Sequence, residues 1–254
     1  MKRILVTNDD GVHSEGIQAL AAALKPLGEV TVVAPLAEAS AIGHALTLRR
    51  PLRLETISDR CYAVDGTPTD CVNIAIASVL RGMPDLVVSG INKGWNLGDD
   101  VTYSGTVSGA FEAALLGAPG IAVSLQRTNG DFDFSGSSRA AFVVAGSVLT
   151  KGLPPQTFLN INVPAGRVKG FKVTVQARRN HITKVNERVD PRGQKYFWIE
   201  EGQNDWEPHD RSDFQAVRDG YISITPLQPD LTASSVIQVI EEEFPLDLGL
   251  LTQA

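Results

Sequence analysis

Arg3-Ile4-Leu5-Val6-Thr7-Asn8-Asp9-Asp10-Gly11, near the start of the chain, decides the fold. The apolar run at residues 3–7 predicts a short buried strand, and two adjacent carboxylates follow where it ends. The first strand of an α/β protein usually lies centrally in the sheet, and the loop after it faces the ligand crevice. Gly11 permits a sharp bend that lets both acids converge. Such neighbours repel each other unless a cation or a basic partner neutralises them. The plainer alternative is that one acid caps a helix beginning near Ser14 while the other lies in solvent.

The bulk composition narrows the class of protein. The chain has 254 residues, 43% of them hydrophobic and 20% charged, which is ordinary for a globular protein. Its net charge of −6 argues against a general binder of nucleic acid or membrane surfaces. Cys61 and Cys71 form no CxxC motif, so both are expected to be reduced. We find no signal peptide and no run that spans a bilayer, and we expect a cytoplasmic protein.

The first part of the chain alternates between strand and helix patterns. This alternation predicts an α/β fold with a mostly parallel sheet and helices on both faces. Strands are predicted at 3–7, 30–34, 61–64, 85–89 and 120–124, an extended stretch around 46–54, and helices at 15–24, 69–80, 105–116 and 138–149.

The pattern changes after Pro154. Strands are predicted at 158–163, 171–175 and 221–225, and a helix at 234–243. Segments 182–189 and 195–199 flank the turn sequence Asp190-Pro191-Arg192-Gly193, which predicts a long β-hairpin. The hairpin has too few apolar residues to be buried alone, so we hypothesise that it packs on another subunit. We expect a single α/β domain over 1–254, with a core at about 1–165 plus the late strand and helix, and an extended hairpin at about 178–202.

Polar side chains follow three of the predicted parallel strands. Asp9 and Asp10 follow the first, Ser40 the second, and Asn92 the strand at 85–89. The carboxyl ends of parallel strands meet at one edge of a sheet, so these side chains can gather around one point. An all-oxygen set suits Mg²⁺ or Mn²⁺, whereas zinc would recruit His or Cys. Taken singly, Ser40 is typical of a cap or a turn, and Asn92 of an Asx-turn.

An anion site is predicted beside this metal site. Tyr103-Ser104-Gly105-Thr106-Val107 leads into a helix whose first amides have no partner within the helix. Ser104 and Thr106 add hydroxyl donors, and Gly105 permits close approach to a phosphate. The plainer interpretation of Ser104 is an ordinary N-cap. A cation beside an anion site is suited to metal-assisted phosphoryl hydrolysis.

Several segments together resemble the SurE family of stationary-phase survival proteins, which are divalent-metal-dependent 5′-nucleotidases and phosphatases. They occur in the family's order over nearly the whole chain. The matching segments are Ile4–Gly11, Val64–Val72, Pro84–Asn92, Tyr103–Val107, Asn160–Pro164 and Gly220–Leu227.

The resemblance implies a Rossmann-like core and a phosphomonoesterase that hydrolyses nucleoside 5′-monophosphates with one divalent ion, Mg²⁺ or Mn²⁺, per subunit. It also implies homodimers or homotetramers built through an extended C-terminal region. Cleavage of 3′-monophosphates or short polyphosphate stays open, as does the nucleophile, which is either a metal-activated water or Asp9 itself. The implied metal ligands are Asp9, Asp10, Ser40 and Asn92, and the implied phosphate contacts are Asn96, Ser104, Gly105 and Thr106.

The loop that carries Ser40 departs from the family pattern. It usually reads Arg-Asn-Gln-Ser-Gly or close to it, whereas here residues 36–41 read Leu-Ala-Glu-Ala-Ser-Ala. Polar neighbours are lost and Glu38 is gained. His44 lies just beyond this loop and His13 lies near the acid pair. Either could act as a general acid, although a solvated loop histidine is the plainer interpretation of His44.

Two other classes of protein compete with this interpretation. A receiver-like phosphoacceptor domain also carries an acidic pair after its first strand, and it would use Asp9 and Asp10 with Asp65 and Lys93. Single receivers are about half this length, and that interpretation leaves residues 104–106 without a role. Haloacid-dehalogenase-type phosphatases require a DxDx[TV] motif, which this chain lacks after its first strand.

Overall fold

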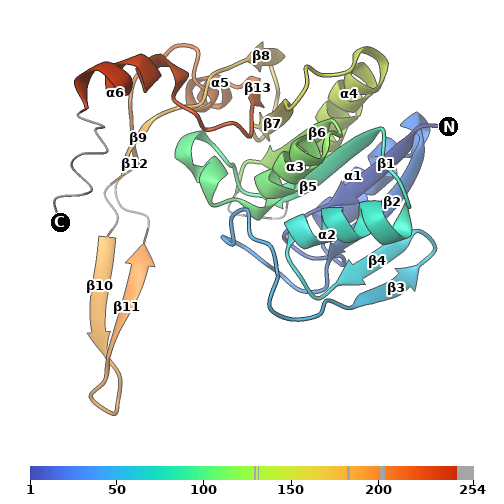
Figure 1. The fold of residues 1–254 in the computed structure, drawn as a ribbon, viewed down its shortest axis with the longest axis horizontal. Helices are drawn as coiled ribbons and strands as arrows, with labels where there is room; N and C mark the ends of the chain where they lie inside the picture. The colour runs from blue at the N-terminus through green and yellow to red at the C-terminus, as the bar shows by residue number, and fades with distance from the viewer. Residues whose placement is uncertain (129, 131, 182–183, 201–203, 245–254) are drawn as a thin grey trace, which may run out of the picture.

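A nine-stranded sheet forms the centre of the molecule in a computed structural model that describes residues 1–128, 130, 132–181, 184–200 and 204–244 (Figure 1). Six neighbouring strands, β4-β2-β1-β5-β6-β7, run parallel; β3 and β13 are antiparallel to their neighbours β4 and β7, and β8 is parallel to β13. The first strand is therefore central, as predicted. The strands in sheet order are β3 (Leu54–Ser58), β4 (Cys61–Val64), β2 (Glu29–Pro35), β1 (Arg3–Thr7), β5 (Leu86–Lys93), β6 (Gly120–Leu125), β7 (Phe158–Val163), β13 (Ile222–Leu227) and β8 (Phe171–Val173).

Helices cover both faces of the sheet. On one face α1 (Glu15–Leu24) and α4 (Ser135–Lys151) pack together, and on the other α2 (Pro68–Ile74) packs against α3 (Gly105–Leu116) (Figure 1). Short helical turns lie at Lys25–Leu27, Ala75–Val79 and Gly98–Thr102. The confirmed fold is thus an α/β fold with a mostly parallel, Rossmann-like sheet.

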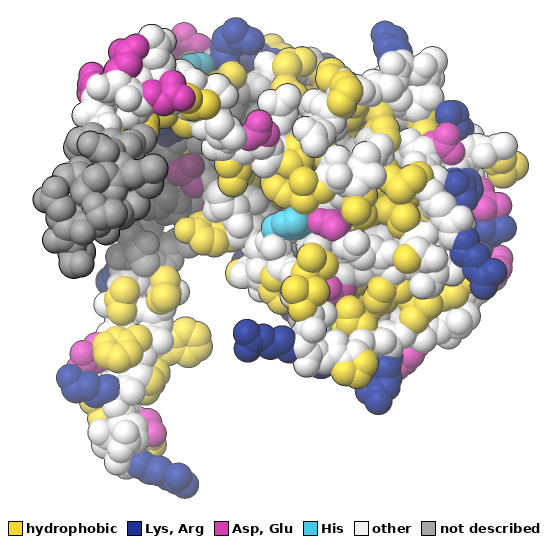
Figure 2. Space-filling model, in the orientation of Figure 1, with side chains coloured by type: hydrophobic (Ala, Val, Ile, Leu, Met, Phe, Trp, Pro, Cys, Tyr) yellow, Lys and Arg dark blue, Asp and Glu magenta, His cyan; other side chains and the backbone are white. Residues whose placement is uncertain are grey.

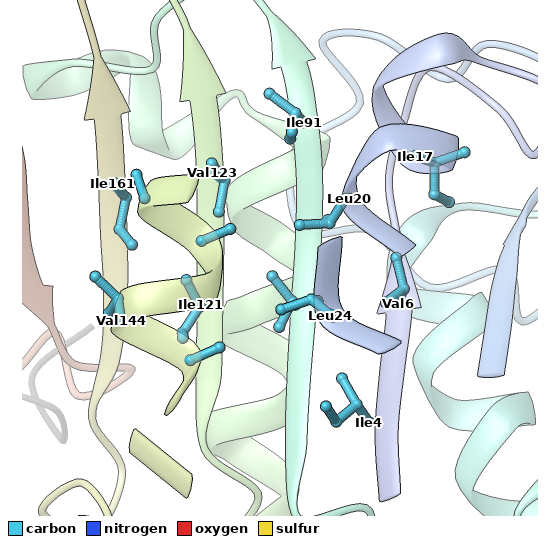
Figure 3. Close-up of a cluster of buried hydrophobic side chains, with 14 of the residues drawn as sticks. Ile4, Val6, Ile17, Leu20, Leu24, Ile91, Ile121, Val123, Val144 and Ile161 are labelled. Atoms are coloured by element: carbon cyan, nitrogen blue, oxygen red, sulfur yellow. The ribbon is translucent and has the colours of Figure 1, made fainter. Parts of the chain in front are cut away.

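The largest part of the hydrophobic core lies between the sheet and the helices α1 and α4. Figure 3 shows Ile4 and Val6 of β1 facing the side chains of α1, while Ile121 of β6 lies beside Val144 of α4. Strands β6 and β7 are buried at every position, which accounts for their mostly apolar residues; the buried Asn160 and Asn162 of β7 are exceptions. This rigid layer holds the strand ends that carry the polar residues described below.

Local signals in the sequence explain most helix ends. The side chain of Ser14 accepts a hydrogen bond from Ile17 N and caps α1. Pro68 occupies the first turn of α2, as predicted, and Gly117 ends α3 in the left-handed region with φ of 91°. Since Ser14 caps α1, neither Asp9 nor Asp10 serves as its cap, and that alternative was wrong.

The C-terminal part adds two small antiparallel sheets, which pair β9 (Arg179–His181) with β12 (Asn204–Trp206) and β10 (Lys184–Val189) with β11 (Lys195–Glu200). The predicted hairpin is confirmed over its described residues; positions 182–183 and 201–202 of the expected range lie outside them. Its turn is closed by a hydrogen bond from Gly193 N to Asp190 O of 3.0 Å. The remaining helices are α5 (Asp213–Arg218), a short turn at Ser234–Val236, and α6 (Ile237–Glu243).

The hairpin β10–β11 extends away from the body of the molecule, with hydrophobic side chains along its surface (Figure 2). Residues directly opposite each other in the pair point to the same side, and alternate residues share a face. One face therefore gathers four apolar side chains that are 56–76% exposed, namely Val185, Val189, Phe197 and Ile199.

Three predicted elements differ from the structure. Strand β5 continues to Lys93, so Asn92 lies at the end of the strand and not in the loop after it. The expected extended stretch at 46–54 forms a strand only from Leu54 onward, because its backbone groups bond to side chains and loops; Thr47 N, for instance, donates to Asp70. The helix expected at 69–80 consists of α2 followed by a π-turn at Ala75–Val79.

None of the helices in the described part of the chain is both long and apolar enough to cross a membrane.

Candidate metal and phosphate site

The turn after β1 is built by its own side chains. Asn8 Nδ2 donates to Gly11 O at 3.1 Å and to Ser14 Oγ at 2.7 Å, which draws the turn onto the start of α1. Gly11 has φ of 96°, a conformation that side-chain-bearing residues rarely adopt. The turn therefore presents Asp9 and Asp10 at the carboxyl end of the sheet.

Asp9 is held in one orientation by the helix beside it. The hydroxyl of Thr106, a fully buried residue of α3, donates to Asp9 Oδ1. Burial raises the pKa of Asp9 above its ordinary value of 3.8; the hydrogen bonds from Thr106 oppose that rise, and the charge of Glu38 adds to it. The buried carboxylate thus has a fixed rotamer and an electrostatic cost when it is charged.

Asp10 lacks a partner for one of its oxygens. Its Oδ2 is buried and has no hydrogen-bond partner among the described residues. Burial, and then the charge of Asp9, raise the pKa of Asp10 to about 6, while the nearby Lys93 lowers it. An orphaned carboxylate oxygen beside a second carboxylate is the arrangement expected where a cation completes the site.

The loop after β2 closes over the turn. Ala39 N donates to Asp9 O at 2.8 Å, and Val12 N donates to Pro35 O at 2.8 Å. These bonds tie residues 36–40 to the acid pair. Ser40 is exposed, and its hydroxyl donates to Glu38 Oε1 at 2.6 Å.

Asn92 lies at the end of β5, and Asn96 lies in the segment that follows this strand. Asn92 Nδ2 donates to Gly94 O at 3.0 Å, which is not an Asx-turn, because there the side-chain oxygen would accept from a backbone N–H. The backbone of Asn96 is held by two asparagines of β7: Asn162 Oδ1 accepts from its N–H at 2.8 Å, and Asn160 Nδ2 donates to its carbonyl at 2.8 Å. The Asn160-Ile161-Asn162 motif therefore positions the loop that carries Asn96.

The start of α3 packs directly against Asp9. Ser104 caps the helix by accepting from Val107 N at 3.1 Å, which leaves its hydroxyl proton available to a ligand. Gly105 is needed for close packing, because a Cβ there would lie 2.7 Å from the Cβ of Asp9. Gly105 thus packs against Asp9 and Thr106 donates to it, while the predicted contacts of both residues to a phosphate stay a prediction.

A pocket of about 850 Å³ brings most of the predicted residues together. Six of the eight line it, whereas Gly105 and Thr106, which contact Asp9, do not. The six are Asp9, Asp10, Ser40, Asn92, Asn96 and Ser104.

Further lining residues were not predicted as part of the metal and phosphate site. Arg127 follows β6 and places a guanidinium at the pocket, where it also donates to Lys93 O at 3.4 Å. The strand-end rule that located Asn92 applies equally to β6, so Arg127 had a detectable signal. Asp100 and Tyr103 also line the pocket. Asp100 lies in a short helical turn and Tyr103 directly follows it, and the strand-end rule makes no prediction for such positions.

The residues of the competing interpretations lie elsewhere or have other partners. Asp65 lies outside the pocket and pairs with Arg50 at 3.2 Å, while Lys93 lines the pocket and pairs with Glu15 at 3.2 Å. His44 is an exposed loop residue, as expected, but it also has partners: its Nε2 lies 2.6 Å from Glu112 Oε2, and its ring packs on Phe111. His13 does line the pocket.

The donor set fits a hard divalent cation. Two carboxylates, a hydroxyl and an amide oxygen surround the pocket, and all four are oxygen ligands of the kind that Mg²⁺ and Mn²⁺ take. No group of three or more His, Cys, Asp or Glu residues in the described part of the chain could hold a metal ion. The thiols Cys61 and Cys71 are free, as expected.

Comparison with known proteins places these features in one family. Residues 4–183 match the family described as Survival protein SurE. A 5′-nucleotidase SurE of Syntrophotalea carbinolica is 54% identical over 230 residues, which cover 90% of this chain and 92% of the relative. A 5′-nucleotidase SurE of Pelobacter propionicus is 54% identical over 240 residues, covering 93% and 97%. The crystal structure of the SurE protein from Aquifex aeolicus matches with a TM-score of 0.84 and 44% identity, covering 94% of this chain and 98% of that one.

Proposed function

Because this chain belongs to the SurE family of survival proteins, we propose that it is a divalent-metal-dependent phosphomonoesterase that hydrolyses nucleoside 5′-monophosphates. Membership makes the chain a phosphatase of the nucleotidase type. We also propose that its activity depends on a metal ion, that the pocket residues have the roles described here, and that the protein is a homodimer or homotetramer. The cytoplasmic location stays a prediction from the sequence.

One observation carries the proposal: the orphaned, buried Oδ2 of Asp10 lies beside Asp9 in a pocket that also contains Ser40 and Asn92. Two adjacent carboxylates with raised pKa values, one buried and one half-buried, are unfavourable in isolation. A divalent ion would neutralise both and take its remaining ligands from Ser40 and Asn92. Ser104, the N-cap of α3, lies on the same pocket, where its hydroxyl could donate to a bound phosphate.

The chain's own residues would bind and orient the substrate. When bound, the ion would supply Lewis acidity at a phosphoryl oxygen and lower the pKa of a water molecule. Ser104 donates its hydroxyl proton, and Arg127 adds a positive charge at the pocket wall. Asp9 is already held by Thr106 through Oδ1, which leaves Oδ2 to the ion or to the phosphorus. Rapid-quench trapping of a phosphoaspartate would identify Asp9 as the nucleophile, and its absence would identify water.

The receiver interpretation is not supported by the positions of its residues. A phosphoacceptor must lie beside the acidic pair, yet Asp65 lies outside their pocket and its carboxylate is engaged by Arg50 and by Arg53 N. We therefore keep the phosphatase alone as the proposed function.

The proposal is tested by phosphate release from a panel of nucleoside 5′- and 3′-monophosphates and short polyphosphate. Purified full-length protein is assayed with Mn²⁺, with Mg²⁺ and with EDTA. We expect turnover of the 5′-monophosphates with either metal and none with EDTA. Turnover that persists in EDTA after metal analysis confirms a metal-free protein would contradict the metal-dependent mechanism.

Substitution of Thr106 by valine tests how Asp9 is oriented. Valine keeps the shape of the buried side chain but removes the hydroxyl that donates to Asp9 Oδ1. Partners that orient metal ligands typically contribute about 10–100-fold to metal affinity, so we expect a loss of that size for Mn²⁺, measured by isothermal titration calorimetry. Thr106→Ser retains a hydroxyl and is the matched control. Equal affinities for the valine and serine variants would show that the hydrogen bond does not matter.

Charged residues on the apolar face of the hairpin test the proposed homodimer or homotetramer. Phe197 and Ile199 are 56% and 76% exposed in the single chain, and so large an apolar face is expected to be covered by another subunit. The double variant Phe197→Glu, Ile199→Glu should shift sedimentation at micromolar concentration to a lighter species. Arg188→Glu, on the opposite face of the same hairpin, should not. A wild-type protein that sediments as a monomer would remove this part of the proposal.

A further inference from the structure

Glu38 is a charged residue in the loop after β2, the loop that also carries Ser40. The proposed function gives Glu38 no role. Its side chain lines the same pocket as Asp9 and Asp10. Its Oε1 lies 2.6 Å from Ser40 Oγ and accepts the hydroxyl proton of that residue. The carboxylate therefore contacts one of the four residues that would hold the ion.

A serine hydroxyl binds a metal ion well only when its proton is oriented correctly. It coordinates a cation through an oxygen lone pair, so its proton has to point away from the ion. Without an acceptor in that direction, the hydroxyl rotates freely and its proton can face the cation. A carboxylate that takes the proton fixes the rotamer and makes the oxygen a stronger donor, as second partners do for other metal ligands. Glu38 is such an acceptor, because its carboxylate takes the hydrogen bond from Ser40.

The backbone around Glu38 is held tightly enough to preserve this geometry. Ala39, between the two residues, donates its N–H to Asp9 O at 2.8 Å. A Cβ on Gly11 would lie 3.4 Å from Ala37 C and 3.6 Å from Glu38 N, so the loop already lies in contact with the turn that carries the acid pair. At the far end of the loop, Gly43 N donates to Tyr103 O at 3.0 Å.

We propose that Glu38 is a positioning residue that orients the Ser40 hydroxyl as a ligand for the divalent cation. This inference rests on the proposed metal-dependent function and adds a residue to its site. Glu38 would also place a third negative charge near the ion. This charge would contribute to the affinity for the cation separately from the hydrogen bond with Ser40.

The experiment separates the hydrogen bond from the charge by measuring Mn²⁺ affinity with isothermal titration calorimetry on metal-free, full-length protein. Glu38→Gln removes the charge but keeps an oxygen that can accept from Ser40, whereas Glu38→Ala removes both. Each variant is made in the wild-type and in the Ser40→Ala background. Glu55→Ala, at an exposed glutamate of the edge strand β3, is the matched control. Melting temperatures in EDTA report whether any variant has lost its fold.

We expect Glu38→Ala to bind Mn²⁺ about fivefold more weakly than Glu38→Gln when Ser40 is present, the change that one side-chain hydrogen bond typically gives. In the Ser40→Ala background the two variants should bind equally. Glu38→Gln should bind more weakly than the parent protein in both backgrounds, because only the charge is lost.

Two results would overturn the inference. If alanine and glutamine at position 38 weaken Mn²⁺ binding equally when Ser40 is present, Glu38 acts as a direct ligand or through charge alone. If neither substitution changes the affinity, the contact is a loop-internal hydrogen bond only. Failure of the proposed function looks different, because wild-type protein would then bind no Mn²⁺, and Asp10→Asn would change nothing.

Discussion

Replacing Asp10 with asparagine is expected to lower metal-dependent phosphate release by roughly 10³-fold or more, because a metal ion typically contributes several kcal/mol to stabilising the transition state. The carboxylate is nearly isosteric with the amide, so the fold should persist while the ion loses a charged ligand. Asp10 has a buried oxygen that no described residue satisfies, which makes it the ligand with the clearest need for a cation. Initial rates with saturating Mn²⁺ measure the effect.

The same substitution should stabilise the metal-free protein at neutral pH. Burial and the charge of Asp9 raise the pKa of Asp10 to about 6, so ionised Asp10 destabilises the folded state above that pH. Asparagine removes this cost, and a gain of about 1 kcal/mol would raise the Tm by about 2–4 °C in a chain of this size. Differential scanning calorimetry in EDTA measures it.

The pH dependence of that gain follows from the direction of the shift. Between pH 6 and the ordinary pKa of 3.8, the folded wild type holds a proton on Asp10 that the unfolded chain has released. The stability of the wild type relative to Asp10→Asn therefore rises as the pH falls through 6, and the advantage of asparagine should disappear near pH 4. An advantage that grows on acidification would contradict the assignment.

Asp65→Asn provides the control for activity. Asp65 also follows a parallel strand, yet it lies outside the pocket and pairs with Arg50. Its substitution should leave turnover unchanged. Stoichiometric, acid-labile labelling of Asp65 by a phosphodonor, without turnover, would return the receiver interpretation to consideration.

Gly105→Ala is expected to reduce both metal binding and turnover by at least tenfold, a loss as large as those seen when partners of metal ligands are removed, roughly 10–100-fold. Alanine is normally the better helix former by about 0.8–1.0 kcal/mol, so propensity alone predicts a more stable protein. Here the new methyl group would lie 2.7 Å from the Cβ of Asp9 and 2.9 Å from its Oδ2. Either Asp9 or the start of α3 has to move, and both belong to the site.

Gly136→Ala is the matched control for this prediction. Gly136 is also in the first turn of a helix, α4, and a Cβ there would meet no atom of the described residues within 4 Å. We expect it to raise the melting temperature slightly and to leave turnover unchanged. Titration of Mn²⁺ and initial rates on both variants make the comparison. Normal metal affinity in Gly105→Ala would show that α3 is free to shift away from Asp9.

Local patterns were sufficient to predict most of the elements and the general position of the site. Apolar runs bounded by Gly and Pro located the strands of the parallel sheet, and Ser14, Pro68 and Gly117 marked helix ends as expected. The rule that parallel strands end at one edge then placed Asp9, Ser40 and Asn92 on one pocket. These predictions succeeded because each depends on neighbours within a few residues or on chain direction alone.

Side-chain partners were harder to predict, because they depend on contacts between distant segments. The hydroxyl of Thr106 donates to Asp9, 97 positions away in the sequence, and this partner was not predicted from the sequence. His44 was interpreted as a solvated residue; it is exposed, yet it also pairs with Glu112, 68 positions away, which was not predicted. In both cases the local sequence is compatible with either partner, and only the packing of α3 against its neighbours selects one.

By itself, the sequence determined a parallel sheet flanked by helices, an oxygen-rich site after its first strand and the SurE family of the chain. Hydrophobic periodicity and backbone geometry act over short distances, and they are written directly into the order of residues. The tertiary structure alone decided that Gly105 makes room for Asp9, that Asn162 holds the loop of Asn96, and that Asp10 keeps an unsatisfied oxygen. Those features arise only when the close packing of helices and strands brings side chains from distant positions within hydrogen-bonding or van der Waals distance.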